Sequence, residues 1–513
     1  VDDYHGTAVA DPYRWMEDPN SAETKAFVAA QDAHAATHLS ALPKLEPLRR
    51  RVRQLLDYRR PANTFTAGPY TVHTANEGWR EQPALFVSEG PKGPRRLLLD
   101  PVEFSKEGHA ALANYSFSKD GKHLAYALSR NGSDWREWRV REVATGKDLP
   151  ELLRWSKFGG ADWKKDGSGF YYTRFEQPPA GQEYTAITKG GTLYFHALGT
   201  SQDEDKIEHK DPQGKAAGYA VQELDGRLIV QELPPPAPEG APRGGGRVWI
   251  KDLTKVQAQG VGLVGGDNGF KPLFDDESAR SQVVGSHEGT LFVLTDLGAP
   301  RGRLLAVDEK DSSKWRVLIP EDPKGAVLSS VRFGPNHVAL LTWIEHAAHR
   351  LELTDTDGKN RRRVPLPGLG QAHYGGFDEG RLIYHYSSFL QPQALYRFDP
   401  ATGKTVLLKG SQKRFDPKRY EAKRVFVRSK DGTKVPMWVV HKKGLKLDGK
   451  NPTYQYGYGG FDAAILPGFS AARIAFLEKG GVFALVNLRG GSEYGRDWHD
   501  QGRRGNKQNV FDD

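Results

Sequence analysis

The fold is decided by residues 117–126, FSKDGKHLAY, in which an Asp-Gly pair stands between two runs of β-forming residues. Asp-Gly in this setting is a strong hairpin signal, because both central positions of the tight turn need positive φ. The pattern returns at residues 163–172, WKKDGSGFYY, and at residues 224–230, LDGRLIV. The sequence therefore predicts β-hairpins that repeat along the chain.

Related units recur from about residue 65 to 408. Each has a strand, an Asp-Gly or short Gly or Asn turn, a second strand and a further β pair. We count seven, beginning near residues 65, 117, 163, 224, 288, 337 and 381. Their spacing of about 45–60 residues is typical of four-stranded propeller blades and predicts a seven-bladed β-propeller. A sandwich of unrelated hairpins is the alternative.

The two flanks of the repeat have a different texture. Before residue 60 we expect helices over 22–41 and 45–58, which combine few breakers with apolar residues at helical spacing. After about residue 410 we expect strands, a helix over 471–478, and the apolar strand 481–487, buried on both faces as in a parallel sheet. These features predict the start of an α/β layer.

The length and composition are those of a large globular chain. At roughly 100–200 residues per domain, 513 residues predict two to four domains. A hydrophobic content of 38% excludes a disordered chain, and no run approaches the ~18 apolar residues of a membrane span. The absence of cysteine excludes disulfides, thiolate zinc sites and a Cys nucleophile. A net charge of +9 is mild at this length, and Arg361-Arg362-Arg363 indicates a solvated basic face.

The glycine-rich segment 457–461, GYGGF, is the sharpest candidate for chemistry. It follows a predicted strand, and its glycine pair leaves the backbone open to a ligand. In α/β-hydrolases such a loop supplies oxyanion donors, although a plain tight turn remains the alternative. Ser492 does not fit a nucleophile elbow, because Tyr494 stands where Gly-x-Ser-x-Gly needs glycine. His499 lacks zinc-like spacing, so we expect a structural or surface histidine.

Five longer motifs carry a family resemblance. They are residues 11–18 (DPYRWMED), 429–437 (SKDGTKVPM), 456–461 (YGYGGF), 487–491 (NLRGG) and 507–513 (KQNVFDD). Together, and in this order, they resemble the prolyl oligopeptidase family of serine peptidases. The resemblance implies three parts: residues 1–60 as the N-terminal helical part of an α/β-hydrolase domain, 61–410 as a seven-bladed β-propeller, and 411–513 as the truncated start of the C-terminal catalytic domain.

The resemblance implies a serine endopeptidase that hydrolyses short peptides on the carboxyl side of proline, with the propeller gating access. Tyr458 matches the tyrosine whose hydroxyl donates to the oxyanion, and Phe461 matches an aromatic wall of the proline pocket. Phe158 matches a propeller residue that lines the adjacent subsite. No metal or cofactor is implied. The chain departs from the family at Asp462, where Asn is usual, and at Ser492, where the family has a third glycine.

The family's Ser, Asp and His triad, and the arginine that holds the substrate carbonyl, lie beyond residue 513. We therefore expect the α/β-hydrolase domain to be incomplete, short by on the order of 200 residues, with strand 481–487 lacking a completed sheet to bury it. We expect two kinds of partner: proline-containing short peptides and the missing C-terminal catalytic segment. We also expect a monomer that binds neither nucleic acid nor membrane. We expect a bacterial cytoplasmic or periplasmic protein.

Two alternatives remain. One is a non-catalytic propeller scaffold, if no downstream segment exists. The other is a different peptidase of the same clan: a dipeptidyl peptidase, an acylaminoacyl peptidase or an oligopeptidase that prefers basic residues. The segment 458–461 favours the prolyl type, because an aromatic proline clamp needs Phe461.

Overall fold

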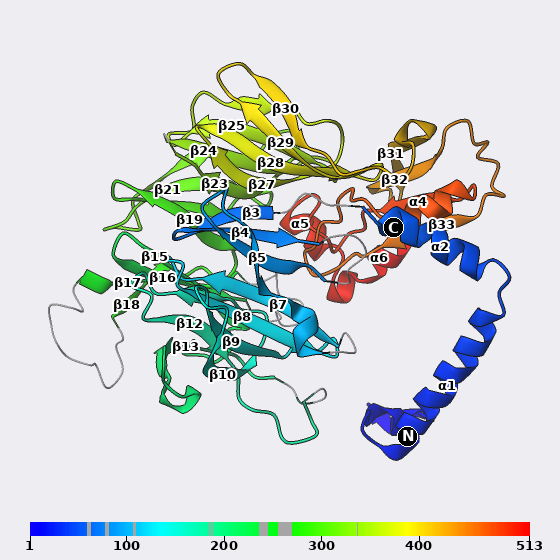
Figure 1. The fold of residues 1–513 in the computed structure, drawn as a ribbon, viewed down its shortest axis with the longest axis horizontal. Coiled ribbons are helices and arrows are strands. Elements are labelled where there is room, and N and C mark those ends of the chain that lie inside the picture. The colour runs from blue at the N-terminus through cyan, green and yellow to red at the C-terminus, as the bar shows by residue number, and fades with distance from the viewer. Residues whose placement is uncertain are drawn as a thin grey trace.

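The computed structural model describes residues 1–58, 63–76, 82–105, 109–183, 186, 188–234, 245–254, 269–335 and 337–513. Seven four-stranded antiparallel sheets follow one another from β3 to β30, and they occupy the left part of Figure 1. Strand β27 of the last sheet contacts β3 of the first, so the series closes on itself. The predicted seven-bladed β-propeller is confirmed, and the sandwich alternative is wrong.

Each blade is built from four consecutive strands. They are β3 (Asn63–Ala67), β4 (Tyr70–Ala75), β5 (Ala84–Glu89) and β6 (Arg96–Leu99); β7 (Ala110–Phe117), β8 (His123–Arg130), β9 (Arg136–Glu142) and β10 (Asp148–Ser156); β11 (Ala161–Trp163), β12 (Gly169–Arg174), β13 (Thr192–Ala197) and β14 (Lys206–His209); β15 (Gly218–Leu224), β16 (Arg227–Leu233), β17 (Val248–Asp252) and β18 (Phe270–Phe274); β19 (Ser281–His287), β20 (Thr290–Thr295), β21 (Arg303–Asp308) and β22 (Trp315–Ile319); β23 (Val327–Phe333), β24 (Val338–Ile344), β25 (His349–Asp355) and β26 (Arg362–Val364); β27 (Gln371–Asp378), β28 (Arg381–Ser388), β29 (Gln391–Asp399) and β30 (Lys404–Lys409).

The Asp-Gly turns are of two kinds. At Asp225-Gly226 both residues have positive φ, 46° and 74°, as expected of a two-residue hairpin turn. At Asp120-Gly121 only the glycine does, with φ of 75°, so the expectation of two positive values is wrong there. That turn is longer because the Asp120 carboxylate accepts from the Ser118 hydroxyl and the Lys122 N–H, which stabilises another geometry.

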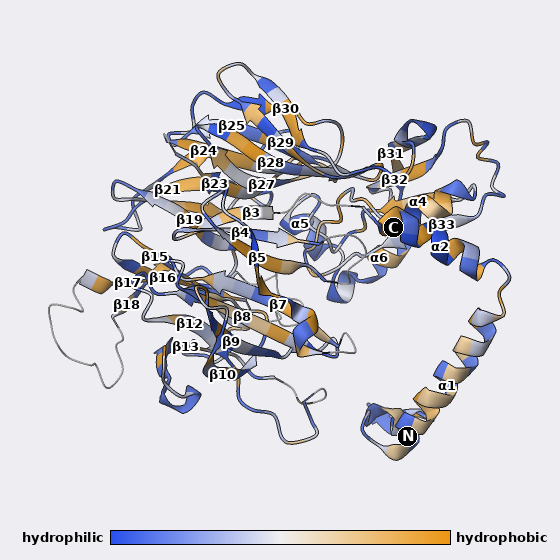
Figure 2. Ribbon diagram, in the orientation of Figure 1, coloured by the Kyte–Doolittle hydropathy of each residue, from blue (hydrophilic) through white to orange (hydrophobic). Residues whose placement is uncertain are grey.

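The propeller core lies between neighbouring sheets. Leu124, Tyr126 and Leu128 alternate along β8, are fully buried, and pack against Val72 and Val87 of the preceding blade. Figure 2 shows that hydrophobic residues are also concentrated on strand β24 and on helix α4. Because each blade buries its face against the next, every sheet depends on its neighbours for stability.

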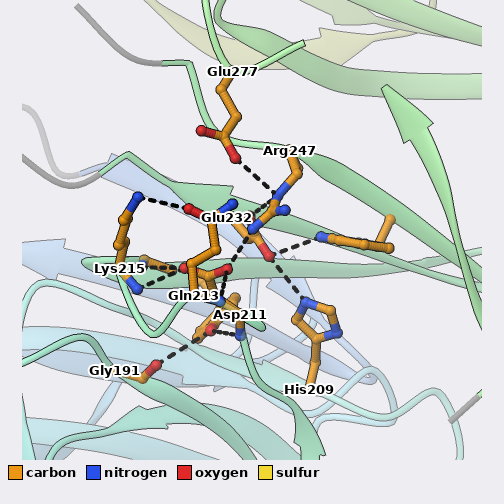
Figure 3. Close-up of polar contacts among 11 residues, drawn as sticks. Gly191, His209, Asp211, Gln213, Lys215, Glu232, Arg247 and Glu277 are labelled. Carbon is orange, nitrogen blue, oxygen red and sulfur yellow. Dashed lines mark hydrogen bonds and ion pairs between the residues drawn. The ribbon is translucent and has the colours of Figure 1, made fainter. Parts of the chain in front are cut away.

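A largely buried ionic cluster joins the third and fourth blades and reaches the connection that leads to the fifth (Figure 3). Arg247 contacts Asp211, donates to Glu232 at 3.0 Å, and lies 3.5 Å from Glu277. Glu232 also accepts from Trp249 at 2.8 Å and lies 3.1 Å from the His209 ring. Burial raises the pKa of Asp211, but backbone N–H donors and Arg247 outweigh it and hold that pKa below its ordinary value. One guanidinium thus balances several carboxylates inside the propeller.

The C-terminal residues form a mixed sheet in the order β31 (Tyr420–Arg428), β32 (Lys434–Lys442), β34 (Val482–Val486), β33 (Thr453–Gly457). Strand β34 is parallel to β33 but antiparallel to β32, so the parallel expectation is right on one side only. All five residues of β34 are buried, which contradicts the expectation that no sheet covers it. Phe483 and Leu485 pack against Trp438, helix α4 and the propeller residue Phe389, and Val486 packs against Val435 and Trp498.

The N-terminal helices behave differently from each other. Helix α2 (Leu45–Leu56) packs on α4 (Ala471–Glu478), whereas α1 (Ala22–Ser40) extends away from the body in Figure 1 and buries only Thr24. The remaining described elements are β1 (Asp2–Tyr4), β2 (Thr7–Val9), η1 (Arg14–Glu17), η2 (Pro101–Phe104), η3 (Gln202–Glu204), η4 (Pro417–Arg419), α5 (Arg496–Asp500), η5 (Arg504–Asn506) and α6 (Gln508–Asp512). Within the described ranges, no helix combines the length and apolarity needed to cross a membrane.

The segments that enter and leave the propeller lie side by side. Arg414, after the last blade, donates to the carbonyl of Asp57 at 3.2 Å, and Arg51 donates to the carbonyl of Arg414 at 3.0 Å. We call these two adjacent segments the neck of the propeller. Beside the neck, the Phe389 ring packs on the rings of Trp438 and Phe483, with its centroid 5.5 and 6.0 Å from theirs. The propeller is thus attached to the α/β layer through an apolar contact next to two adjacent chain segments.

Candidate active site

The loop that follows β33 presents two aromatic rings to solvent. Tyr458 is 47% exposed and Phe461 is 88% exposed, and their ring centroids lie 6.1 Å apart. No residue in the described part of the chain makes a hydrogen bond with the Tyr458 hydroxyl, which leaves it available to a ligand. The structure therefore brings together two of the three site residues that the sequence suggested.

The loop has a strained backbone. Gly459, Phe461 and Asp462 have φ values of 59°, 55° and 56°. A left-handed conformation costs a non-glycine residue about 1–2 kcal/mol, and persists only when the surroundings impose it. Two consecutive non-glycine residues in this conformation therefore indicate a loop held in place by its neighbours.

Backbone carbonyls fasten the loop to the layer beneath it. Lys507 donates to the Gly459 carbonyl at 2.9 Å, and the Asp462 N–H donates to the Gly490 carbonyl at 3.2 Å. His499 is buried and its Nδ1 donates to the same Gly490 carbonyl at 2.7 Å. Of the two expected settings, structural or surface, the burial and hydrogen bond of His499 fit the structural one.

Arg489 connects three of the sequence motifs. Its buried guanidinium contacts Asp513 at 2.6 Å, Asp431 at 2.5 Å and Ser429 at 3.2 Å. The hydrogen bond from Arg489, followed by that from the Thr433 N–H, lowers the pKa of Asp431 to about 2. The three motifs therefore hold one another in position. This contact could not be recognised from the sequence, because the motifs are far apart in it.

Glu493 supports the other end of the loop. Its Oε1 accepts from the Ile465 N–H at 2.9 Å and from Asn487 at 3.0 Å, while its Oε2 is buried and has no hydrogen-bond partner among the residues that the structure describes. Burial raises the pKa of Glu493 above its ordinary value. This carboxyl was missed in the sequence, because nothing local marks it as buried.

Phe158 belongs to the propeller, in the turn between β10 and β11. It is 59% exposed and has a φ of 53°, beside a Gly159 carbonyl that accepts from Arg136 at 2.9 Å. No ring contact joins Phe158 to Tyr458 or Phe461, all three of which lie within the described residues. The structure thus shows no direct contact between the Phe158 ring and the aromatic pair.

Where the loop meets the fifth and sixth blades, the two parts of the chain line a cavity of about 220 Å³. Arg280 and Asp296 line it from the propeller, and Asp462 and Arg496 line it from the α/β layer. Asp462, the residue after Phe461, lines this cavity. The cavity therefore lies between the loop that carries the aromatic pair and the propeller.

Comparison with known proteins identifies this arrangement. The model of the prolyl oligopeptidase N-terminal β-propeller domain matches residues 1–411, and that of the prolyl oligopeptidase family matches residues 467–513. The chain belongs to the prolyl oligopeptidase family.

Similar members of the prolyl oligopeptidase family are known in sequence and structure. A prolyl endopeptidase of Elizabethkingia meningoseptica is 32% identical over all of this chain and 70% of its own length. One solved structure, from a study of two prolyl endopeptidases and their inter-domain dynamics, is 33% identical with a TM-score of 0.88, covering 100% of this chain and 73% of that one. Prolyl oligopeptidase B of Galerina marginata, solved with a 35mer hydrolysis and macrocyclization substrate, is 26% identical with a TM-score of 0.87, covering 98% and 72%.

Proposed function

We propose that this chain belongs to a serine endopeptidase that hydrolyses short peptides on the carboxyl side of proline. In this enzyme the propeller restricts access to the active site. The observation that carries the proposal is the exposed pair Tyr458 and Phe461, 6.1 Å apart on a loop with left-handed backbone at Phe461. Relatives named prolyl endopeptidase, similar over the whole chain, support the same chemistry.

The proposed mechanism is acyl transfer. A serine attacks the carbonyl of a prolyl residue, and the Tyr458 hydroxyl donates a hydrogen bond to the oxyanion that forms. A preorganised donor of this kind contributes about 10²–10³ in rate. The Phe461 ring packs on the proline ring, whose rigid face suits an aromatic wall. The family's serine, aspartate and histidine have no counterpart among residues 1–513.

Two finer assignments belong to the proposal. Phe158 lines the subsite next to the proline pocket from the propeller side, in keeping with its exposed ring. Residues 1–60 and 411–513 form one hydrolase unit around the propeller at 61–410. The packing of α2 on α4 and the contact between Arg414 and Asp57 support this division.

Tyr458→Phe in the protein expressed from its complete reading frame tests the mechanism. We expect kcat on a proline-containing chromogenic peptide to fall by about 10²–10³, with KM changed by less than about threefold. Phe461→Ala is the companion variant, and it should raise KM for the proline peptide while sparing kcat. An unchanged kcat in Tyr458→Phe would remove this residue from the oxyanion role.

A parent protein that cleaves no proline peptide would favour the scaffold alternative. Cleavage after basic residues, or release of dipeptides from a free N-terminus, would instead point to another peptidase of the clan.

A further inference from the structure

Two ion pairs of opposite polarity cross the cavity between the fifth blade and the active-site loop. Arg280 of the propeller lies 3.4 Å from Asp462 of the loop, and Arg496 of the α/β layer lies 3.7 Å from Asp296 of the propeller. Arg496 also donates to the carbonyl of Ser278 at 2.8 Å. Charges alternating in this way favour one relative position of the two surfaces, because a shift brings like charges together.

Asp462 contributes the negative charge of the first pair from the active-site loop. Its side chain is only 9% exposed, and a buried carboxylate without a cation is costly. The propeller supplies that cation through Arg280, which directly precedes β19.

Asp462 is also the residue after Phe461, and both have left-handed backbone. A side chain that anchors Asp462 therefore limits how far the Phe461 ring can move. We infer that Arg280 is a positioning residue: by pairing with Asp462 when the propeller is seated, it holds the aromatic wall of the proline pocket in place. This inference rests on the proposed function, since Phe461 must be that wall.

The test is Arg280→Ala in the protein expressed from its complete reading frame, with N-terminally blocked Gly-Pro and Gly-Ala p-nitroanilides as substrates. We expect KM for the proline substrate to rise about fivefold, as for loss of one partly buried ion pair, and kcat to stay within about twofold. KM for the alanine substrate should change less, because no proline ring meets Phe461. Arg280→Lys should recover most of the loss.

Arg301→Ala is the matched control. Arg301 lines the same cavity, but its guanidinium pairs with Glu321 at 3.1 Å within the propeller. This variant removes the same charge without touching Asp462 and should keep the parental KM. If Arg280→Ala and Arg301→Ala behave alike, the positioning role is refuted.

A double variant separates positioning from general destabilisation. Asp462→Asn removes the charge that needs a cation, so adding Arg280→Ala to it should have almost no further effect on KM. Independent, multiplying effects would refute the coupling. Raising the salt from about 0.05 M to about 1 M should increase KM of the parent more than that of Arg280→Ala, which keeps only the Arg496–Asp296 pair.

The outcomes also separate this inference from the proposed function. A parent protein without cleavage after proline would overturn both. A parent that cleaves after proline, with Arg280→Ala unaffected, would overturn only the role of Arg280.

Discussion

Arg51 and Glu478 form a two-pronged ion pair between residues 427 positions apart in sequence. The Nε and Nη2 atoms of Arg51 lie 2.8 and 2.6 Å from the two carboxylate oxygens of Glu478, which joins α2 to the end of α4. Planar, paired contacts of this kind are stronger than single ones. Helix α2 is thereby joined to an α/β layer whose residues follow the propeller in the sequence.

Glu478→Gln should loosen this junction. Both side chains are partly exposed, 31% and 24%, so we expect a cost of about 1 kcal/mol in local opening of α2. Limited proteolysis should then cut faster near residue 57, while amide exchange in the blades stays unchanged. Glu46→Gln is the control, since Glu46 pairs only with the exposed Arg49 on the same helix in the described contacts. Equal proteolysis of the two variants would contradict the role of the pair.

Gly459→Ala should disrupt the active-site loop. The position has a φ of 59°, and a Cβ there would overlap Val510 and lie 3.0 Å from the Leu488 Cβ. The loop must shift, so we expect peptidase activity to fall at least tenfold. Gly460→Ala is the matched control, because a Cβ at Gly460 meets no atom within 4 Å and its φ lies outside the left-handed range. Similar losses in both variants would argue against the specific strain at Gly459.

Glu493→Gln should raise stability at neutral pH. Burial raises the pKa of Glu493, so the folded state retains a proton that the unfolded chain releases. Stability is therefore favoured below the unfolded pKa, near 4.5, and is lost as pH rises through the folded pKa. Glutamine does not titrate, so the gain in Tm over the parent should be present at about pH 8 and shrink toward about pH 5. A gain independent of pH would show that ionisation is not the cause.

Arg247→Met should be the most damaging of these changes to the propeller. It leaves the carboxylates of Asp211 and Glu232, 3% and 6% exposed, without their cation. Removing one partner of such a buried group costs about 3–5 kcal/mol. Amide exchange in β16 and β17 should accelerate far more than in the distant blade β27–β30. Arg247→Lys, which keeps the charge, should have a smaller effect, and protection of β16 equal to that of the parent would contradict the prediction.

The repeat could be predicted because its signals are local. A turn such as Asp225-Gly226 and the alternation in the strands around it depend on residues a few positions apart. The helix over Ala471–Glu478 follows for the same reason. Where a local signal was ambiguous, as at Asp120-Gly121, a side-chain hydrogen bond chose the turn geometry.

The contacts that shape the candidate site could not be predicted, because they join distant segments. Strand 481–487 had the composition of a buried strand, but only the fold shows that Phe389 of the last blade helps to cover it. Tyr458 and Phe461 are close in sequence, so their pairing was within reach of sequence reasoning. Arg280 was not, since nothing near it indicates that Asp462 lies 3.4 Å away.

The packing of α2 on α4 has a consequence for the nascent chain during synthesis. Helix α2 leaves the ribosome before the blades, and its partner α4 follows more than 400 residues later, as the 427-residue interval between Arg51 and Glu478 shows. At about 5–20 residues per second, α2 waits for roughly 20–85 seconds with its apolar side uncovered. During that interval the nascent chain offers chaperones a defined target, the face of α2 that carries Val52, Leu55 and Leu56.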